Sequence, residues 1–420
     1  MMMLRDHEQR VLERCDALFD RTLDLLRELV AEYSVLGEEA GVLATMQRWF
    51  ERLELPVERV PLDDPGLAAH PCHAPVDWPC AGRYNLVSAL NRDAGGPHLV
   101  FNGHLDVVPA EPIDTWTRPP WEPWEEDGWL YGRGAGDMKA GIAAMVMAVA
   151  AVREAGVALD FPLTLQTVIE EECSGNGALA CIQRGHHGDF VLIPEPFGAR
   201  LYTGQVGVVR FRIRVDGVPA HVLDTAAGSD AIDTMLRLLP ALKALEEELN
   251  AERTAPYDSH AHPFNLNVGR LEGGNWASSV PAHAIVEGRL GFAPGVSPAT
   301  IMQRLRDGVR RAHAEQGLPG GPPRVDFPGF RSEGHLVDLD SPGIALLGDC
   351  HRALTGKPIE PYLSTCTTDL RAFHVAGVAG TCYGPVAERI HGIDERVDIA
   401  SIRHVLKAYA LFLCRWRDSA

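Results

Sequence analysis

Three consecutive glutamates, Glu170, Glu171 and Glu172, come at the end of an apolar stretch that predicts a buried strand over residues 161–169. A Ser-Gly-Asn-Gly segment follows shortly after them and predicts a turn. Carboxylates packed this closely repel one another, so they require a cation between them or must share protons. The simpler interpretation is a solvated turn after a strand, and the rest of the chain decides between the two.

Two other segments offer ligands for a borderline divalent metal, which prefers imidazole nitrogen and carboxylate oxygen. One is Gly103-His104-Leu105-Asp106, and the other is a glycine-lined segment that leads to Asp137. In a His-x-Asp pair on an extended segment both side chains share a face, so Asp106 could accept the second ring N–H of His104 and fix its tautomer. Chance also produces such pairs, and Asp137 alone could be an N-cap.

Phosphate-binding motifs are absent from the two places where they could be suspected. The segment Gly132-Arg133-Gly134 is followed by Asp137 where a dinucleotide-binding loop needs its third glycine. The segment Thr355-Gly356-Lys357 lacks the first glycine of a phosphate loop, because His351 stands at that position.

An α/β sheet would bring these polar residues together. Short apolar strands are predicted at residues 98–102, 161–169 and 190–193, with helices at residues 138–154 and 177–184 between them. This alternation predicts a sheet with parallel strands, whose carboxyl ends form the ligand crevice. The side chains expected to gather there are His104, Asp106, Glu171, Glu172 and Glu195.

The middle of the chain follows a different pattern. Apolar and arginine residues alternate from Val209 to Val215, which predicts a half-buried antiparallel strand. The predicted order over residues 206–330 is β-α-β-β-α-β, a ferredoxin-like unit. We therefore expect two domains. One is a catalytic α/β domain formed by residues 1–205 and 331–420, with a mixed, largely parallel sheet between helices. The other is an inserted α+β lid and dimerisation domain.

Helices and a tryptophan cluster complete the expected outline. One long amphipathic helix is predicted over residues 4–33, and a closing helix over residues 400–416. Ser341-Pro342 should begin another helix that Gly356 ends. The Trp-rich segment 116–129 could wall a substrate pocket or simply pack across a loop.

Composition excludes several classes of partner. The chain has 420 residues, too many for one core, and a formal net charge of −18, which argues against nucleic acid and anionic membranes. Nine cysteines without a Cys-x-x-Cys pair indicate reduced thiols. The first ten residues lack the apolar core of a leader, and the apolar run at residues 140–152 is shorter than the ~18 residues of a membrane span. We expect a soluble, cytoplasmic protein.

Six motifs carry a resemblance to a known family, in this order: His104-x-Asp106, Gly-Arg-Gly-Ala-Gly-Asp-Met-Lys around Asp137, Glu170-Glu171-Glu172, Glu195-Pro196, Thr368-Asp369-x-Arg371 and His391. Together they resemble the co-catalytic zinc amidohydrolase family that contains acetylornithine deacetylase, succinyl-diaminopimelate desuccinylase, aminoacylase and carboxypeptidase G. The resemblance covers nearly the whole chain, including the inserted domain.

The resemblance implies a cofactor of two divalent metal ions, with zinc as the first expectation and cobalt or manganese as alternatives. His104 and Glu195 would bind one ion, and Glu172 and His391 the other. Asp137 would bridge both ions, and the Asp137–Met138 peptide would be cis.

The resemblance also implies catalytic roles. Glu171 would be the general base that acts on a water between the ions, and Asp106 would orient His104. His221 would stabilise the oxyanion in the active site of a partner subunit, so a homodimer is expected. Arg371 is the candidate for the substrate carboxylate, with Thr368 near it, although Arg371 could equally be structural.

Three departures from the family pattern bear on the substrate. Glu170 stands where relatives have aspartate, which should be tolerated because this residue is not a ligand. In the inserted domain, Ser278-Ser279-Val280-Pro281 replaces Asn-x-Val-Pro, and Arg289-Leu290-Gly291 replaces Asp-Ile-Arg. The identity of the acyl amino acid therefore stays open.

The sequence thus predicts a metal-dependent hydrolase that cleaves the amide bond of an N-acyl amino acid, in the manner of acetylornithine deacetylase. Desuccinylase, aminoacylase, carboxypeptidase and dipeptidase activities are the near alternatives, with a dipeptide as the other small substrate. A catalytically silent relative that binds a metabolite is the alternative of a different class.

Overall fold

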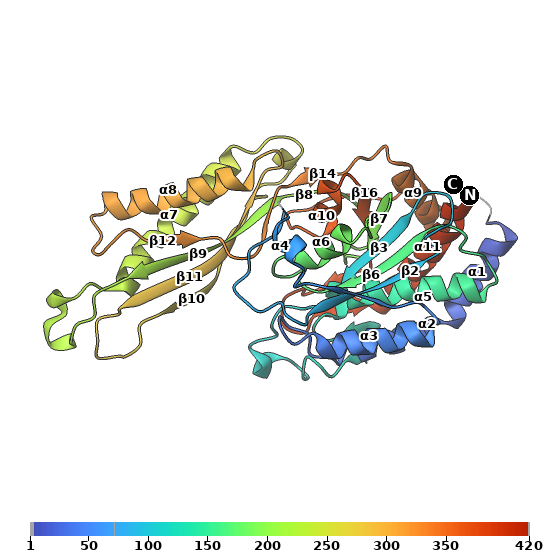
Figure 1. Ribbon diagram of the computed structural model, residues 1–420, viewed down its shortest axis with the longest axis horizontal. Coiled ribbons are helices and arrows are strands. Elements are labelled where there is room, and N and C mark those ends of the chain that lie inside the picture. The colour runs from blue at the N-terminus through green and yellow to red at the C-terminus, as the bar shows by residue number, and fades with distance from the viewer. Residues whose placement is uncertain (1–3, 71, 419–420) are drawn as a thin grey trace.

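The computed structural model describes residues 4–70 and 72–418, which form two lobes joined end to end (Figure 1). The larger lobe contains both ends of the described chain, and the smaller lobe extends away from it. Residues 1–3, which belong to the segment predicted to lack a leader, lie outside the described residues. Separate hydrophobic clusters fill the two lobes.

The larger lobe is built on a six-stranded mixed sheet. Four neighbouring strands are parallel, and two antiparallel strands complete one edge. In spatial order the strands are β1 (Glu58–Pro61), β2 (Tyr84–Leu90), β6 (Leu163–Val168), β3 (Leu99–His104), β7 (Phe190–Ile193) and β16 (Ala379–Cys382). The predicted mixed, largely parallel sheet is confirmed.

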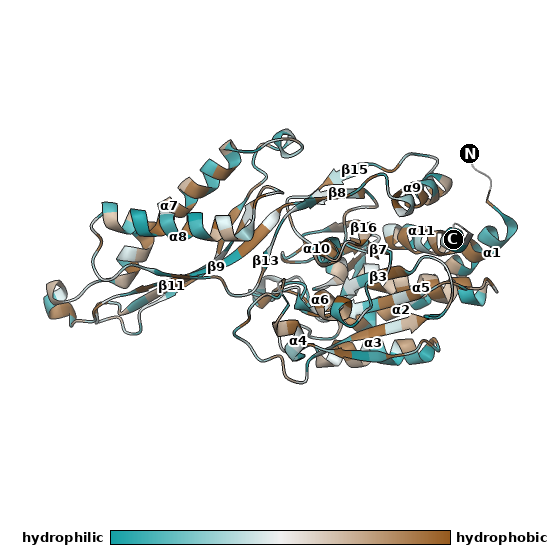
Figure 2. Ribbon diagram, turned by 45° about the horizontal axis from the view of Figure 1, so that its top comes forward, coloured by the Kyte–Doolittle hydropathy of each residue, from teal (hydrophilic) through white to brown (hydrophobic). Residues whose placement is uncertain are grey.

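Helices cover both faces of this sheet because its strands are apolar on both sides. Phe101 and Leu192 point into the larger core, whereas Val100 and Val191 point into a smaller cluster beneath α10. Figure 2 shows the hydrophobic residues concentrated between the sheet and its covering helices. The helices are α1 (Asp6–Ala17), α2 (Phe19–Val30), α3 (Ala40–Arg52), α4 (Pro65–Ala68), α5 (Ala140–Glu154), α6 (Asn176–Gln183), α9 (Pro342–Thr355), α10 (Leu370–Val375) and α11 (Ile399–Asp418).

The prediction of one helix over residues 4–33 is wrong. The segment forms α1 and α2, and Leu18 separates them with φ −94° and ψ 0°. The break lets α1 pack on α11 and α5 while α2 packs on α3 and α5, so each helix buries its own apolar face. Thr22 is buried in α2, where its hydroxyl donates to the carbonyl of Leu18.

Helix α5 lies at the centre of the larger core. The segment Ala135–Glu154 is long and apolar enough to cross a membrane, but 94% of its most apolar window is buried inside the protein. It is therefore packed as the core helix that the sequence predicts. Helix α9 begins after Ser341 and ends at Gly356 in the left-handed conformation, also as predicted.

The smaller lobe is an antiparallel sheet with two helices on one face. The spatial order β10-β11-β9-β12, with β13 also paired to β9, is the ferredoxin-like order. The elements are β9 (Gly207–Asp216), α7 (Ala231–Ala251), β10 (Leu266–Gly273), β11 (His283–Phe292), α8 (Pro298–Glu315), β12 (Arg324–Asp326) and β13 (Arg331–Ser332). We call this lobe the lid and the face of its sheet without helices the open face.

The last strand of the ferredoxin-like order, β12, is short. Strand β12 ends at Asp326, because Pro328 cannot donate to the sheet. Two small sheets complete the larger lobe. One contains β8 (Leu201–Gln205), β14 (His335–Leu336) and β15 (Pro361–Leu363), and the other contains β4 (Trp124–Glu126), β5 (Trp129–Tyr131), β17 (Ala387–Glu388) and β18 (Arg396–Asp398).

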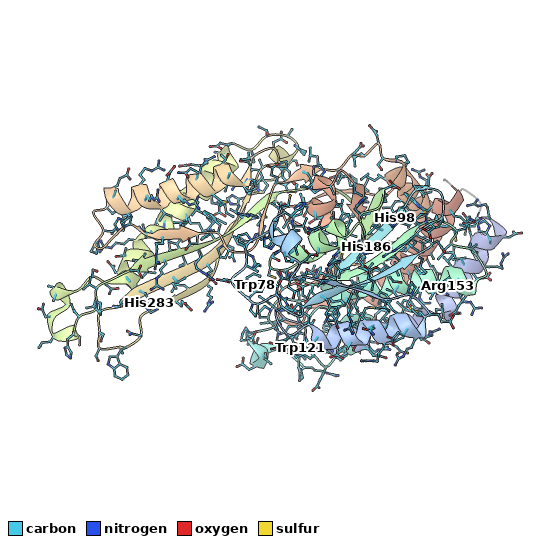
Figure 3. The ribbon with its side chains drawn as sticks, in the orientation of Figure 1. Trp78, His98, Trp121, Arg153, His186 and His283 are labelled. Atoms are coloured by element: carbon cyan, nitrogen blue, oxygen red, sulfur yellow. The ribbon has the colours of Figure 1, made fainter. Side chains whose placement is uncertain are left out.

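The Trp-rich segment packs on itself. Trp116, Trp124 and Tyr131 form a buried cluster, and the rings of Trp124 and Tyr131 stack with centroids 4.7 Å apart. Trp121 lies at the surface of this loop (Figure 3). None of these tryptophans lines the cavity that Glu171, Glu172 and Glu195 line, so the packing alternative holds.

Candidate metal centre and active site

The carboxyl ends of three adjacent strands meet at one edge of the central sheet. Strand β3 ends at His104, β6 ends two residues before Glu170, and β7 ends two residues before Glu195. Asp137 arrives on the loop before α5, and His391 on the loop before β18. The alternation of strands and helices was enough to predict this meeting of the first three segments.

Asp137 lies between two histidines. Nε2 of His104 is 3.1 Å from one carboxylate oxygen of Asp137, and Nε2 of His391 is 3.5 Å from the other. His391 is also 3.1 Å from Oε1 of Glu172. The two oxygens of Asp137 therefore face different imidazoles, and the Asp137–Met138 peptide is cis.

A cavity of about 390 Å³ opens onto this cluster. Asp137, Glu171, Glu172, Glu195 and His391 all line it. Potential ligand atoms of His104, Asp137 and Glu172 lie within 4.8 Å of one another. The structure thus brings all five predicted metal ligands and the predicted base to one place.

The charges of the cluster indicate a site for a cation. Burial raises the pKa of Glu195 well above its usual value, and nearby Asp137 raises it further. Burial likewise raises the pKa of Glu171. Although burial opposes it, Glu172 and Asp137 raise the pKa of His391 to about 11. Carboxylates and imidazoles in this arrangement form a donor set that suits divalent metals such as zinc, so the residues fit the metal centre that the motifs imply.

The prediction for Asp106 needs correction. His104 Nδ1 is 2.8 Å from the backbone carbonyl of Asp106, whereas the nearest Asp106 carboxylate oxygen is 3.7 Å away. The carboxylate instead accepts the backbone N–H groups of Glu171 and Glu172, at 3.3 and 3.1 Å. Asp106 therefore fixes the ring of His104 through its main chain and the glutamate turn through its side chain.

Glu170 is a structural residue. It is fully buried with φ 73°, a left-handed conformation that is uncommon for residues other than glycine. Its carboxylate is held by Arg83, by Ser174 and by the indole N–H of Trp78, the last at 2.7 Å. These contacts account for the tolerance of glutamate at this position.

Sequence reasoning missed Glu395, which shapes the loop that carries Asp137. Its buried carboxylate accepts the backbone N–H groups of Gly134, Gly136 and Asp137 at 2.9–3.1 Å. It also pairs with buried Arg133 at 2.6 Å. Its place four residues after His391 was the only signal in the sequence.

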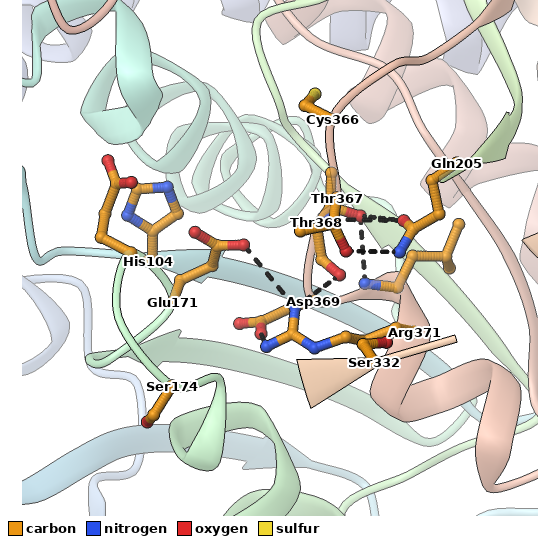
Figure 4. A network of polar contacts seen from close by, with 12 residues as sticks. His104, Glu171, Ser174, Gln205, Ser332, Cys366, Thr367, Thr368, Asp369 and Arg371 are labelled. Carbon is orange, nitrogen blue, oxygen red and sulfur yellow. Dashed lines mark hydrogen bonds and ion pairs between the residues drawn. The ribbon is translucent and has the colours of Figure 1, made fainter. Parts of the chain in front are cut away.

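Thr368 and Arg371 lie beside Glu171 in different environments (Figure 4). Thr368 lines the cavity, and its hydroxyl donates to the side-chain carbonyl of Gln205 at 3.1 Å. Arg371 is buried behind Glu171, 3.8 Å from its carboxylate and 3.5 Å from Asp369, with Phe330 against its guanidinium. Arg371 is not among the residues that line the cavity, unlike Arg210 and Arg289, which the sequence reasoning did not select.

His221 lies outside this cluster. It is exposed and follows β9, a strand whose carboxyl end points away from the larger lobe (Figure 1). Its ring nitrogen Nδ1 accepts the backbone N–H of Leu223 at 3.0 Å. Within one chain, His221 therefore contributes nothing to the cavity.

Comparisons with known proteins agree with this geometry. The sequence profile of Peptidase family M20/M25/M40 matches residues 100–415. A succinyl-diaminopimelate desuccinylase from Methylibium petroleiphilum is 30% identical over 414 residues, which cover 94% of this chain and 97% of the relative. An N-formyl-4-amino-5-aminomethyl-2-methylpyrimidine deformylase from Bacillus subtilis is 27% identical over 338 residues, 76% of this chain and 79% of the relative.

Solved structures share the fold across the whole chain. The di-peptidase Dug1p from Saccharomyces cerevisiae superimposes with a TM-score of 0.82 at 15% identity, covering 99% of both chains. An M20 family metallo-carboxypeptidase from Sulfolobus solfataricus gives a TM-score of 0.72 at 17% identity, covering 94% of this chain and 99% of that one. Because the family profile matches residues 100–415, most of the chain, the chain belongs to peptidase family M20/M25/M40.

Proposed function

We propose that this protein uses two divalent metal ions, zinc in the first instance, to hydrolyse the amide bond of an N-acyl amino acid. The proposal rests on one observation: the side chains of five predicted ligands gather at one place. Asp137, Glu172, Glu195 and His391 line a single cavity together with Glu171, and His104 contacts Asp137 beside it. Such ions would polarise the scissile carbonyl and make water nucleophilic near neutral pH. In this assignment His104 and Glu195 would hold one ion, Glu172 and His391 would hold the other, and Asp137 would contribute to both.

Glu171 is the residue left to move protons. Its carboxylate is buried at the cavity wall, and burial raises its pKa, which suits a group that must accept and return a proton. Arg371 at 3.8 Å offers a fixed positive charge that limits this shift. Glu171 would take a proton from the attacking water and deliver it to the leaving amine.

Glu171→Gln tests this assignment, with Glu172→Gln and exposed Glu126→Gln as matched comparisons. We expect Glu171→Gln to lower kcat by about 10²–10⁴-fold while metal content stays near the wild-type level. Glu172→Gln should lose metal and activity together, and Glu126→Gln should lose neither. Turnover that survives in Glu171→Gln would contradict the assignment of Glu171 as the base. It would not contradict the proposed metal centre.

Chelation tests the metal requirement. Dialysis against a chelator should abolish hydrolysis, and adding back zinc, cobalt or manganese in turn should restore it to different degrees. Unchanged activity after complete metal removal would contradict the mechanism. The same samples identify the metal that supports the highest kcat.

The choice of acyl group needs a substrate screen. Acetylornithine-like deacetylation is the activity proposed from the motifs, and desuccinylation is the second candidate because the Methylibium relative bears that name at 30% identity. Dipeptide hydrolysis is a third, in view of the fold shared with di-peptidases. Comparing kcat/KM for N-acetyl, N-succinyl and N-formyl amino acids and for dipeptides ranks them. A catalytically silent protein would cleave none.

We also propose a homodimer formed through residues 206–330, in which His221 serves the active site of the partner subunit. Large apolar side chains near His221 are exposed, including Leu223 at 90% and Trp276 at 73%. Strand β10 also leaves a free edge on the lid sheet. A monomer in sedimentation velocity that retains full activity would contradict this arrangement. No disulfide bond joins the cysteines within the part of the chain that the structure describes, which supports a cytoplasmic location.

A further inference from the structure

Two arginines face each other across the lid sheet at its end nearest the active site. Arg210 of β9 and Arg289 of β11 are direct cross-strand partners. Like charges in this arrangement destabilise a sheet. The next such pair on the same face is complementary, because Arg212 lies opposite Glu287 and forms an ion pair with it at 2.6 Å. The Arg210–Arg289 pair therefore lacks the compensating charge that the neighbouring Arg212–Glu287 pair has.

Neither arginine has a carboxylate partner within residues 4–70 and 72–418. Arg210 donates to the backbone carbonyl of Glu172. The side chain of Arg289 forms no hydrogen bond or ion pair in the described part of the chain, and its Nε is buried without a partner. The nearby thiol of Cys366 cannot neutralise it, because burial raises the pKa of that thiol to about 11.

The pair stands where two cavities meet. Both arginines line the cavity of about 390 Å³ that contains Glu171 and the metal-ligand cluster. Both also line a second cavity of about 290 Å³, on the open face of the lid sheet, together with Trp78 and Asn267. Trp78 lies between the two lobes in Figure 3. A group bound by these arginines would thus lie next to Glu171 and the metal-ligand cluster. The second cavity would leave room for a larger molecule.

Both arginines are partly buried. Withdrawing a guanidinium from water without a counterion is costly, and a second one beside it adds repulsion. A ligand carboxylate would relieve both effects, because the planar guanidinium can bind two carboxylate oxygens at once. We propose that Arg210 and Arg289 together bind a carboxylate of the amide substrate, so that the enzyme selects anionic amides. This inference rests on the proposed hydrolase function and assigns its specificity to two named residues.

The carboxylate could belong to the amino acid or to the acyl group, and two substrate pairs distinguish these sources. The first pair is an N-acetyl amino acid and the same compound with its α-carboxylate converted to an amide. The second is an N-succinyl amine and the corresponding N-butyryl amine. In the wild type, the pair that includes the recognised carboxylate should show the larger difference in KM.

Arg210→Gln and Arg289→Gln are then compared with Arg214→Gln, which alters an exposed arginine of the same strand that pairs with Asp216. We expect each of the first two variants to raise KM for the recognised anionic substrate by about 10–100-fold. They should change kcat/KM for its neutral partner by less than about threefold. Arg214→Gln should behave as the wild type with both.

Equal losses on charged and neutral substrates would assign the arginines a structural role and overturn the inference, as would unchanged kinetics. Binding of succinate, measured by calorimetry on the metal-loaded protein, gives a readout that does not depend on turnover. The wild type should bind more tightly than Arg289→Gln, and equal affinities would also overturn the inference. Failure of the proposed function looks different, because the wild type would then cleave none of the four amides.

Discussion

The carboxylate of Asp106 accepts the backbone N–H of Glu172 across 3.1 Å, which joins the end of β3 to the glutamate turn that follows β6. The same carboxylate accepts the N–H of Glu171. One buried side chain therefore sets the main-chain position of both the proposed base and a proposed metal ligand. Its backbone carbonyl meanwhile orients His104, so Asp106 connects three residues of the proposed site through two different groups.

Replacing Asp106 by alanine should disturb catalysis more than folding. The two N–H groups would lose their acceptor, each at a cost of about 1–3 kcal/mol, and we expect kcat to fall about 10–100-fold. Asp106→Asn keeps one acceptor oxygen and should lie between alanine and wild type. Steady-state kinetics with metal analysis checks this order, and an alanine variant with wild-type kcat would show that the turn holds its position unaided.

Glu395 should matter for stability because its charge is buried with that of Arg133. Removing one partner of a buried ion pair leaves the other uncompensated, so Glu395→Ala should lower the free energy of unfolding by about 3–5 kcal/mol. Glu388→Ala removes the partner of Arg396 at the surface and should cost less than about 1 kcal/mol. Chemical denaturation of both variants makes the comparison. Equal losses of unfolding free energy would mean that the buried Arg133–Glu395 pair contributes no more to stability than the surface pair.

The sequence was most informative where one strand end determined one functional residue. His104 and Glu195 could be placed because β3 and β7 are short apolar runs whose carboxyl ends lie at one edge of a parallel sheet. The motifs similarly selected Asp137 and His391, although nothing in their local sequence indicates the direction in which their loops fold. Those two positions depended on the resemblance.

Contacts between distant segments were the part that could not be predicted. Arg371 follows Asp369 by two residues and looked like a substrate contact, but Phe330 covers its guanidinium from another part of the chain. Arg289 looked like a departure from a pattern, and only the register of β11 on β9 shows it opposite Arg210. The break at Leu18 was equally invisible, because the apolar periodicity continues through it while the tertiary partners change.

His335 should make the protein sensitive to acid. It is buried in β14 and stacked on His374 with ring centroids 4.2 Å apart, and neither ring nitrogen has a hydrogen-bond partner among the described residues. Burial, helped by His374 and Arg371, lowers the pKa of His335 to about 3. Between pH 6.5 and about pH 3, His335 binds a proton in the unfolded chain but not in the folded protein. The free energy of unfolding therefore falls as the pH falls through this range.

His335→Leu should remove this contribution. The difference in unfolding free energy between the variant and the wild type should depend on pH. From pH 7.5 to pH 5 it should shift in favour of the variant by on the order of 2 kcal/mol. Urea denaturation at several pH values gives the difference directly, so that the titration of carboxylates common to both proteins cancels. Exposed His187→Leu serves as the control. Parallel pH profiles for wild type and His335→Leu would refute the assignment.

The proposed role of His221 in the partner subunit makes a prediction about mixtures. His221→Ala should lose most activity, because its subunits lack the donor that would stabilise the developing oxyanion. Glu171→Gln should be inactive for a different reason, since it lacks the base. In a mixed dimer, the His221→Ala subunit keeps Glu171 and receives an intact His221 from its partner, so one of the two sites is complete.

Unfolding and refolding the two inactive variants together should therefore restore activity. Random pairing makes half of the dimers mixed, each with one complete site, so about a quarter of the wild-type activity should return. Each variant refolded alone is the control and should stay inactive. If His221 acted on the site of its own chain, every site in the mixed dimer would lack either the base or the histidine. In that case no activity would return, even though sedimentation showed the dimer to be intact.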